Sequence, residues 1–462
     1  MRDTATDTAM TFDTGHPAAH VLIIGGGASG VLMAAQLLSL APATRVTIIE
    51  KSAMLGCGIA YATDNPDHLL NTRVHNMSAF PDDPDHFLRW LHRSGEAPQA
   101  TGACFVGRQT YGRYLGSLIA GPTEDQPEGR HDSRLRCLRD DCTRLDSDPD
   151  GVRAHLKTGA VLSADVAILA TGHAVSPTPG GGLRGGWDFT PPASPDVPVV
   201  IIGTGLSMVD HVVSLIGSGH RGQITCLSRR GLLPRAHAPA TAMTIDRDVL
   251  PIGGSVSQVL HWLRRQARQA EAKGGTWRDA VDGVRPHVTA IWQSWDREER
   301  RRFLRHAASW WEVHRHRMPP RSAEVIARAQ ARGQLALLKA RFEEATPDGP
   351  LCKVRITTSA GDLRRMTGHV IDCRGIRRDP ETASAAVVLD LIARGAARVD
   401  SLRLGLDTTE DARLIDRDGR PSDRVFAIGP CARGALWEIT AIPDIRVQCA
   451  ALAASLSERL AL

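Results

Sequence analysis

The sequence lacks a long hydrophobic run, a paired-cysteine pattern and a strong net charge, and each absence excludes a class of protein. No apolar stretch approaches the roughly 18 residues of a membrane span, and residues 1–19 lack the apolar segment of a signal peptide. The nine cysteines are scattered, with no disulfide framework and no CxxC metal site. We therefore expect a cytoplasmic protein with no metal, no membrane contact and a mobile N-terminal tail over residues 1–19.

The rest of the composition is that of a folded globular protein. With 42% hydrophobic and 23% charged residues among 462, the chain is long enough for two or three domains. Its formal charge of +5 is mild for this length and falls short of that of a dedicated nucleic-acid binder. No GxSxG turn of a serine hydrolase is present either. Small anionic ligands fit this balance better than nucleic acid.

Residues 21–38, VLIIGGGASGVLMAAQLL, read as an apolar strand, a glycine turn and a helix. In Gly25-x-Gly27-x-x-Gly30 the first glycine permits a tight turn, the second lets backbone approach a pyrophosphate, and the third allows close helix–strand packing. The next strand, RVTIIE, ends twenty residues after Gly30 in Glu50, where a carboxylate accepts hydrogen bonds from ribose hydroxyls. This context predicts a dinucleotide site. Its predicted contacts are Gly25, Gly27, Ala28, Ser29, Gly30, Glu50 and Lys51.

The same pattern returns at residues 198–216, PVVIIGTGLSMVDHVVSLI. Gly203-x-Gly205 follows an apolar strand and opens a second helix, but the third glycine is replaced by Met208, which loosens the match. The sequence therefore predicts a second dinucleotide site, with contacts from Gly203, Gly205, Leu206 and Ser207.

The segment ITCLSRRG, 224–231, indicates which nucleotide this second site binds. Ser228 stands where the first unit has Glu50, and Arg229 and Arg230 follow it. A carboxylate would repel a ribose 2′-phosphate, whereas a hydroxyl and guanidinium groups bind it. We therefore predict NADPH rather than NADH, held by Ser228, Arg229 and Arg230. The alternative is two solvated arginines at the end of a strand.

A second internal echo predicts two nested units. Residues 150–173 and 352–376 both read as an alternating strand, a glycine-containing hairpin and an apolar strand that ends in Thr-Gly or Arg-Gly. The predicted fold is α/β, with two dinucleotide-binding (Rossmann-like) domains, the second inserted in the first, and an added helical subdomain. We place the first domain at 20–190 and 379–462, the second at 191–378, and the helical subdomain at 255–345.

Taken together, these motifs resemble the two-dinucleotide-binding flavoproteins. Among them, the chain is similar to bacterial FAD/NAD(P)-binding proteins related to the class B flavin monooxygenases and the lysine and ornithine N-hydroxylases. Besides the two glycine turns, the resemblance rests on residues 55–91, on DVAILATGH at 165–173 and on VFAIGPCARGALWEITAIPDIR at 425–446. It implies FAD in the first unit and NADPH in the second. It also implies a flavin-proximal segment with Asn71, Asn76, Met77 and Ser78, and further FAD contacts from Thr171, Gly172, Gly429, Pro430, Trp437 and Ile442.

The sequence departs from that family at several positions, and these differences limit which activities and contacts can be carried over. Gly429-Pro430 stands where many relatives have Gly-Asp, so another group must replace that carboxylate contact to FAD. His173 stands where N-hydroxylases often have tyrosine, and no F-x-G-x3-H-x3-W stretch of a Baeyer-Villiger enzyme precedes the second glycine turn. Cys137 and Cys142 have the spacing of a disulfide-reductase pair, but they lie about 110 residues beyond the first glycines, too late for a pair near the flavin.

Two helical segments suggest further roles. Pro443 can open the last helix, whose N-terminus would stabilise reduced flavin if it pointed at the flavin N1 and C2 carbonyl; a plain packing helix is the alternative. The tract at 310–317, with two tryptophans, two histidines and two arginines, could hold nicotinamide-nucleotide phosphates or the carboxylates of a small substrate through His314 and Arg317. Alternatively, its tryptophans only anchor helices to the core.

The resulting functional prediction is an FAD-dependent, NADPH-consuming monooxygenase. By analogy with the N-hydroxylases, it would N-oxygenate a small amine or amino acid with O2 through a C4a-hydroperoxyflavin, and a homo-oligomer is compatible with the sequence. One alternative is an NADPH-dependent flavin oxidoreductase that passes electrons to an acceptor without oxygen insertion. Another is a non-catalytic flavin-binding interaction protein.

Overall fold

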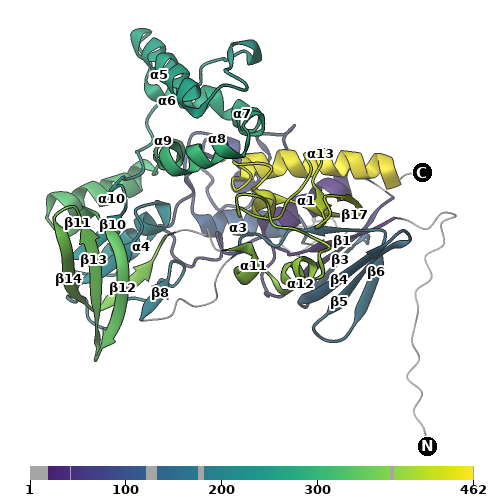
Figure 1. The fold of residues 1–462 in the computed structure, drawn as a ribbon, viewed down its shortest axis with the longest axis horizontal. Helices are drawn as coiled ribbons and strands as arrows, with labels where there is room; N and C mark the ends of the chain where they lie inside the picture. Colours follow the sequence, from purple (N-terminus) through teal and green to yellow (C-terminus); the bar gives the residue numbers. More distant parts are fainter. Residues whose placement is uncertain (1–18, 42, 121–132, 175–181, 375–378, 461–462) are drawn as a thin grey trace, which may run out of the picture.

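Two parallel β-sheets, each covered on both faces, organise the chain (Figure 1). The structure is a computed structural model that describes residues 19–41, 43–120, 133–174, 182–374 and 379–460. The predicted α/β class with two Rossmann-like units is confirmed. The expected N-terminal tail lies outside the described residues except for Ala19.

The first sheet has six strands in the order β16-β17-β7-β1-β2-β3, all parallel except β16. The strands are β1 (His20–Ile24), β2 (Arg45–Glu50), β3 (Leu135–Arg139), β7 (Val166–Leu169), β16 (Arg413–Ile415) and β17 (Pro421–Ala427). Successive residues of β1 serve opposite faces, as the two-residue period of a strand requires. Val21 and Ile23 belong to one core cluster, while Leu22 and Ile24 belong to the other. Burial on both faces explains why the strand reads as an unbroken apolar run.

Helices cover one face of this sheet and a smaller sheet covers the other. On the helical side α1 (Ala28–Leu40) packs beside the last helix, α13 (Ile442–Leu460), with α2 (His86–Arg93) and α3 (Arg108–Ser117) nearby. The opposite side carries the antiparallel strands β4 (Cys142–Asp148), β5 (Gly151–Leu156) and β6 (Val161–Ala164), with α12 (Ala386–Arg394) against them. Short turns complete this part: η1 (Val74–Asn76), α11 (Pro380–Ala383) and η5 (Gly429–Ala432).

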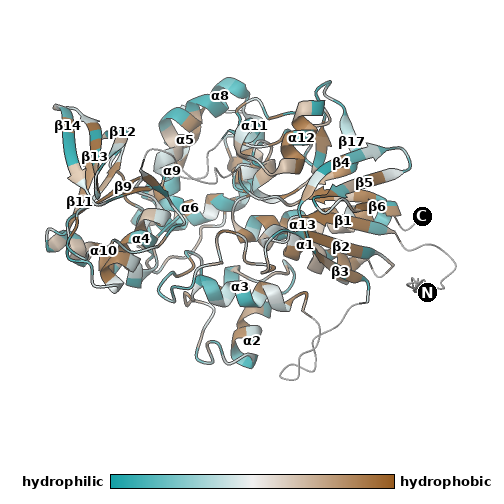
Figure 2. Cartoon of the chain, turned by 90° about the horizontal axis from the view of Figure 1, so that it is seen from below, coloured by the Kyte–Doolittle hydropathy of each residue, from teal (hydrophilic) through white to brown (hydrophobic). Residues whose placement is uncertain are grey.

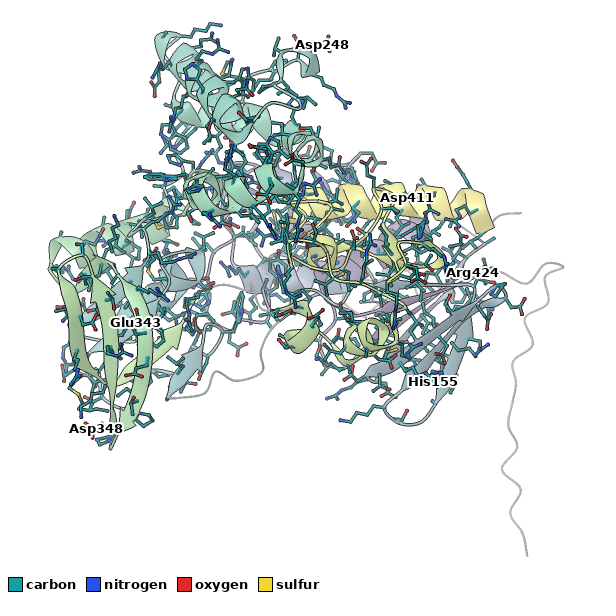
Figure 3. All side chains as sticks on the ribbon, viewed as in Figure 1. His155, Asp248, Glu343, Asp348, Asp411 and Arg424 are labelled. Carbon is teal, nitrogen blue, oxygen red and sulfur yellow. The ribbon has the colours of Figure 1, made fainter. Side chains whose placement is uncertain are left out.

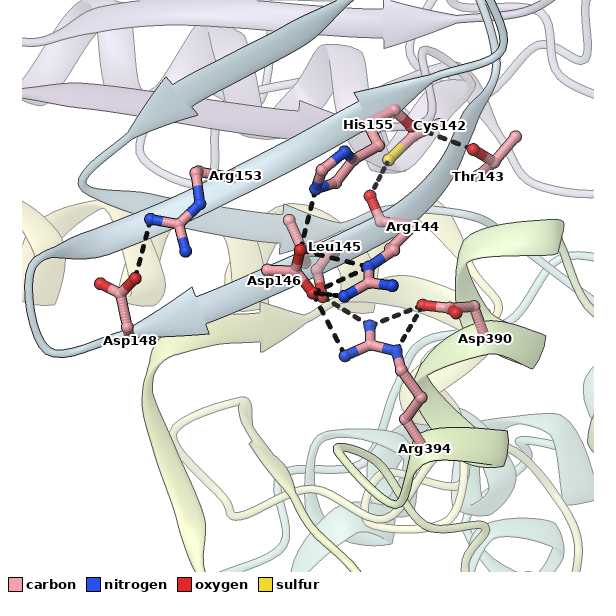
Figure 4. A network of polar contacts seen from close by, with 10 residues as sticks. All are labelled: Cys142, Thr143, Arg144, Leu145, Asp146, Asp148, Arg153, His155, Asp390 and Arg394. Atoms are coloured by element: carbon pink, nitrogen blue, oxygen red, sulfur yellow. Dashed lines mark hydrogen bonds and ion pairs between the residues drawn. The ribbon is translucent and has the colours of Figure 1, made fainter. Parts of the chain in front are cut away.

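Charged contacts fasten the returning C-terminal segment to the first unit (Figure 4). Asp146 on β4 accepts hydrogen bonds from Arg144 at 3.0 Å and from His155 at 2.8 Å. Arg394 of α12 pairs with the same carboxylate at 3.3 Å and also with Asp390. The chain therefore comes back to the unit that it left more than two hundred residues earlier.

The second sheet has five parallel strands in the order β11-β10-β9-β15-β8. These are β8 (Leu183–Gly185), β9 (Val199–Ile202), β10 (Ile224–Ser228), β11 (Leu335–Lys339) and β15 (His369–Asp372). The helices α4 (Leu206–Gly217) and α10 (Pro320–Ala331) cover one face. The antiparallel strands β12 (Arg341–Asp348), β13 (Leu351–Thr358) and β14 (Gly361–Thr367) cover the other. Charged side chains such as Glu343 and Asp348 lie along β12 (Figure 3), and β14 is largely hydrophilic (Figure 2).

A helical subdomain stands between β10 and β11 and projects from the rest of the molecule (Figure 1). It contains α5 (Val256–Ala272), α6 (Trp277–Val284), α7 (Val288–Ser294), α8 (Arg297–Arg302) and α9 (Ala308–Arg315). Three shorter pieces belong to it: η2 (Arg247–Val249), η3 (Arg285–His287) and the π-helical turn η4 (Phe303–Ala307). Ser255 and Thr276 begin α5 and α6 as capping boxes, which explains where these helices start.

The structure corrects two predicted boundaries. The predicted helical range 255–345 runs too far, because Gly333, with a φ of +72°, ends the helical chain and LALLK then forms β11 beside β10. An apolar run of four residues cannot by itself distinguish a buried strand from a helix. The first-domain range 20–190 is also too long, since β8 pairs with β15 of the second sheet.

A buried ion pair joins the two units. Arg108 of α3 pairs with Asp210 of α4 at 2.9 Å, and both side chains are less than 15% exposed. Next to it, the side chain of Ser214 on α4 contacts Asn65 at 3.0 Å and His68 at 2.7 Å. Burial raises the pKa of Asp210 to about 6, although Arg108 acts in the opposite direction.

Replacing Arg108 with alanine should lower the free energy of unfolding by about 3 kcal/mol at pH 8, because it leaves a buried carboxylate without its partner. The pKa of Asp210 is raised in the folded state, so below pH 6 this carboxyl group takes up a proton. The neutral carboxyl group is less costly to bury without Arg108. The cost should therefore shrink at pH 5. Urea unfolding at both pH values measures it. Arg113→Ala, on the same helix but in the more exposed pair with Glu96, should cost at most about 1 kcal/mol at either pH. Equal costs for the two variants would contradict this assignment.

Candidate functional site

The first glycine turn has a backbone that other residues could not adopt. Gly25 has a φ of +107°, and a Cβ there would lie 2.5 Å from the carbonyl oxygen of Ala170. A Cβ on Gly30 would lie 1.9 Å from the carbonyl oxygen of Gly25. After Gly27 the helix α1 begins with Ala28 and Ser29 and without a side-chain cap. The N–H groups of its first turn are therefore free of side-chain competitors for an anion.

Glu50 holds this turn in shape from the end of β2. Its Oε2 accepts a hydrogen bond from the Gly26 N–H at 2.7 Å, and its Oε1 accepts one from the Ser52 N–H at 2.8 Å. Lys51 beside it is exposed. The following loop passes over the start of α1: a Cβ on Gly27 would lie 3.5 Å from the Cα of Gly58. Backbone without side chains thus faces backbone across the site, which suits a pyrophosphate.

The C-terminal segment completes the first site. Gly429 has a φ of +67°, and a Cβ there would lie 2.4 Å from the Ser29 Oγ, so Gly429-Pro430 sits at the N-terminus of α1 as the resemblance implies. The Gly429 N–H donates to the Gln448 Oε1 at 2.8 Å, while the Gln448 Nε2 is buried without a partner. This buried amide donor lies beside Gly429, where the sequence predicts an FAD contact. No short-range sequence pattern marks Gln448 as part of this site.

Thr171 and Gly172 lie at the same edge of the sheet. They follow β7, and the preceding Ala170 donates its N–H to the Ile24 carbonyl at 2.8 Å, beside the glycine turn. Gly172 has a φ of +71°. Burial lowers the pKa of His173 to about 4, so this histidine is neutral at physiological pH. Thr171, Gly172 and His173 therefore follow β7 at the edge of the sheet that carries the first glycine turn.

The predicted flavin-proximal segment lies at the junction of both units and α13. The carbonyl of Asn71 accepts a hydrogen bond from His237 of the second unit at 2.9 Å. Asn76 ends the turn η1, and Met77 and Ser78 are buried. Arg446 of α13 donates to the carbonyl of Ser78 at 2.9 Å. This placement suits a segment between two nucleotides, and its contact with the flavin ring stays a prediction.

The second glycine turn repeats the geometry of the first. Gly203 has a φ of +115°, and a Cβ there would lie 2.3 Å from the carbonyl oxygen of Cys373. The helix α4 begins after Gly205 with Leu206 and Ser207, again without a side-chain cap. Met208, in place of the third glycine, is fully buried in the core cluster with Val199 and Ile201. Its side chain is therefore accommodated in the apolar core, and the turn is preserved.

Ser228 takes the structural place of Glu50 in the second unit. Its Oγ accepts hydrogen bonds from the Thr204 Oγ1 at 2.9 Å and from the Gly231 N–H at 3.0 Å. Arg229 is exposed, and Arg230 donates to the carbonyl of Arg305 at 2.6 Å. All three predicted residues line a cleft of about 700 Å³ together with the glycine turn.

Two further arginines of this cleft were not predicted. Arg341 and Arg374 line it from the segments that follow β11 and β15. Arg374 is held by Asp372 at 2.8 Å, whereas Arg341 is largely exposed. Because carboxyl ends of parallel strands share one edge of a sheet, an arginine after each strand is the signal that could have found them.

A buried ionic network ties the helical subdomain to the start of α13. The Arg315 guanidinium lies 3.3 Å from the Glu438 carboxylate, and the Trp311 Nε1–H donates to the same carboxylate at 2.6 Å. Burial raises the pKa of Glu438, but Arg315 and its neighbours outweigh this and hold that pKa below its ordinary value. Arg285 pairs at 3.4 Å with Asp444, in the first turn of α13. Ile442 begins this helix, as predicted, with Pro443 in the first turn.

Three predicted residues of this region have internal partners. Arg317 is 3% exposed, and its guanidinium makes two hydrogen bonds with Asp282 at 2.7 and 3.0 Å. His314 bonds to the carbonyl of Trp310 at 2.7 Å. Trp437 packs against Trp292 with ring centroids 5.1 Å apart. The structure thus gives Arg317 a structural partner in place of a substrate carboxylate, and the predicted contact of Trp437 with FAD stays a prediction.

A family model matches part of the first unit, and solved structures match the whole fold. Residues 22–174 match the FAD-NAD(P)-binding family model. Ornithine N-hydroxylase from Kutzneria sp. 744, solved with reduced FAD, NADP+ and L-ornithine, superposes with a TM-score of 0.64 at 13% identity, covering 96% of this chain and 100% of that one. Ornithine hydroxylase from Pseudomonas aeruginosa gives 0.63 at 16%, covering 96% and 100%, and L-lysine 6-monooxygenase from Pseudomonas syringae 0.61 at 14%, covering 97% and 100%.

The superpositions establish the fold. The family model identifies an FAD/NAD(P)-binding region in the first unit. No curated protein matches the sequence. Within the described residues, no helix is long and apolar enough to cross a bilayer. The same part of the chain has no group of three or more side chains suited to a metal ion.

Changing Gly30 to alanine should abolish the first site. The new methyl group would overlap the Gly25 carbonyl oxygen, so we expect a loss of about 3 kcal/mol or more of stability and most of the bound FAD. Flavin absorbance per protein and the melting temperature measure both effects. Gly217→Ala is the control, because no atom lies within 4 Å of the new Cβ on α4. Full FAD content in Gly30→Ala would refute the assignment.

Changing Arg229 to alanine should raise the KM for NADPH at least about tenfold, since a hydrogen bond to a charged group contributes about 1.5–3 kcal/mol. The KM for NADH, which lacks the 2′-phosphate, should stay within about twofold of wild type. Steady-state oxidation of each coenzyme gives the two values. Arg153→Ala, a solvent-exposed change on β5, should alter neither. A parallel loss for NADPH and NADH would show that Arg229 does not read the phosphate.

Proposed function

We propose that the protein is an FAD-dependent, NADPH-consuming monooxygenase that N-oxygenates a small amine or amino acid with O2. The observation that carries this proposal is the pair of uncapped helix N-termini, each at the carboxyl edge of its own parallel sheet. The fold likeness to ornithine and lysine hydroxylases supports it. When bound, FAD would accept electrons from NADPH and use them to activate O2.

The residues of the first site fit FAD. Gly25, Gly27 and Gly58 provide a backbone-lined space for the pyrophosphate, and Glu50 stands at the ribose position. Gln448 offers a buried amide donor beside Gly429. No step of the reaction needs a charged acid or base from this segment, since its role is to bind and orient the cofactor.

The residues of the second site fit NADPH. Leu206 and Ser207 form the start of α4, whose backbone N–H groups would bind the pyrophosphate. Ser228 and Arg229 offer a hydroxyl and a positive charge to a 2′-phosphate. His316 lines the same cleft, and burial lowers its pKa to about 4. This histidine therefore stays neutral and adds no positive charge of its own beside the nucleotide.

Transfer of electrons to an acceptor without oxygen insertion is the second candidate. The fold likeness to bacillithiol disulfide reductase from Bacillus cereus, with a TM-score of 0.52 at 15% identity, favours it. A dithiol version of that chemistry is disfavoured by the cysteines. Cys142 is buried on β4, where burial raises its thiol pKa to about 12, and burial also raises the pKa of Cys137 on β3. A raised pKa lowers the fraction of thiolate, on which such exchange depends.

Isotopically labelled O2 separates the two candidates. Holoprotein is incubated with NADPH, 18O2 and a panel of amines and amino acids, and products are analysed by mass spectrometry. We expect one 18O atom in a hydroxylamine product and one NADPH consumed per oxygen inserted. Reduction of an added quinone by NADPH, with no label in any organic product, would instead establish the electron-transfer reading.

A further inference from the structure

The helical subdomain has an open-sided cavity of about 380 Å³ whose walls are almost entirely apolar. Seven of the nine tryptophans of the chain line it; the other two are Trp90 and Trp187. The remaining wall is mostly aliphatic side chains of α5, α6 and α7, together with Phe303, Arg264 and His314. An apolar concave surface with few polar groups is typical of a site for a small ligand.

The tryptophan rings are held in place by hydrogen bonds that point away from the cavity. The Nε1–H groups of Trp292, Trp295 and Trp311 donate to Gly434 O at 3.0 Å, Gly254 O at 2.8 Å and the Glu438 carboxylate at 2.6 Å. The N–H groups of these three rings are therefore already paired, and the rings offer a ligand apolar contact. The cavity is preorganised and offers apolar contact with few hydrogen bonds.

The helix α9 is shared between this cavity and the nucleotide cleft. Ser309, Glu312 and His316, at helical spacing, line the cleft, whereas Trp310, Trp311 and His314 line the cavity. On another side the wall is Trp437, in the segment that runs from Gly429, beside α1, to the start of α13. Two elements of the cavity wall, α9 and the segment before α13, therefore also lie beside the predicted nucleotide sites.

The charges of the walls select the ligand. Apart from the tryptophans, the polar side chains among the described residues that line the cavity are Arg264 and His314, and none is a carboxylate. Arginine guanidinium groups already lie over Trp277, Trp292 and Trp437, at 4.4, 5.0 and 4.2 Å from the ring centroids. A second cation gains little from these rings, so a cationic side chain is a poor occupant and a neutral hydrocarbon group a good one.

We propose that this tryptophan-lined cavity binds an aliphatic or aromatic group of the substrate, so that the substrate is an apolar amine and not a diamino acid. This rests on the proposed function above. Trp310, 46% exposed, stands at the rim and leaves a way in. The amine would stay outside the apolar wall.

Calorimetric titration of the oxidised holoprotein with n-alkylamines from butylamine to octylamine, and with L-ornithine, tests the proposal. Burying one methylene is worth about 0.8 kcal/mol, so the affinity should rise about fourfold per carbon, and ornithine should bind more weakly than hexylamine. Because most tryptophans line the cavity, binding should also change the intrinsic fluorescence. Affinity independent of chain length, or tighter binding of ornithine, would overturn the proposal.

Two variants of α5 locate the binding. Ala267, half-buried in the cavity wall, is replaced by tryptophan to fill the space, and Ala272, exposed at the end of the same helix, is the matched control. Ala267→Trp should weaken octylamine at least about tenfold, whereas Ala272→Trp should not change it. Unchanged binding by Ala267→Trp would overturn the site. FAD content and melting temperature verify folding. If Ala267→Trp does not fold, Trp310→Ala at the rim serves as the second variant, and it should also weaken the binding of octylamine.

The outcomes separate this inference from the proposed function. Chain-length-dependent binding that Ala267→Trp removes, without any oxygenated product, would support the apolar site and count against the monooxygenase. Incorporation of 18O into ornithine, with no preference for apolar amines, would do the reverse.

Discussion

The architecture depends on one repeated constraint: in each unit a glycine lies in close backbone contact with the ends of the neighbouring parallel strands. In the first unit Gly25 donates its N–H to Ile49 at 2.9 Å and presses its Cα side against the Ala170 carbonyl. In the second, Gly203 donates to Leu227 at 2.8 Å and meets the Cys373 carbonyl in the same way. No side chain fits at either point, so both turns expose bare backbone and a helix N-terminus to the same kind of anionic ligand.

Buried charge, in contrast, connects the units. Arg108 with Asp210, Arg315 with Glu438 and Arg285 with Asp444 all lie where elements from different parts of the chain meet. Such pairs add little net stability, but each becomes costly when its partner is misplaced. They therefore favour one relative placement of the two sheets and the helical subdomain, which a hydride transfer between two bound nucleotides requires.

The sequence pattern predicts the parts of the site that local backbone geometry dictates. The glycine turns, Glu50 and the start of α13 follow from short-range patterns, and the two β-meanders were visible as an internal echo. What it missed depends on distant contacts. Gln448 reaches Gly429 only because α13 packs beside α1, and Arg341 and Arg374 converge only once β11 and β15 join one sheet. The sequence also places β11 within the helical range, because its four apolar residues carry no decisive period.

The helical subdomain shows how one helix can serve two different chemistries. A helix presents residues three and four apart on one face, so Ser309 and Glu312 of α9 line the nucleotide cleft while Trp310 and Trp311 line the apolar cavity. A packed helix resists bending and shifts as a unit, so a substitution that displaced the tryptophan face of α9 would also move Glu312. The apolar cavity and the nucleotide cleft are therefore mechanically joined through α9.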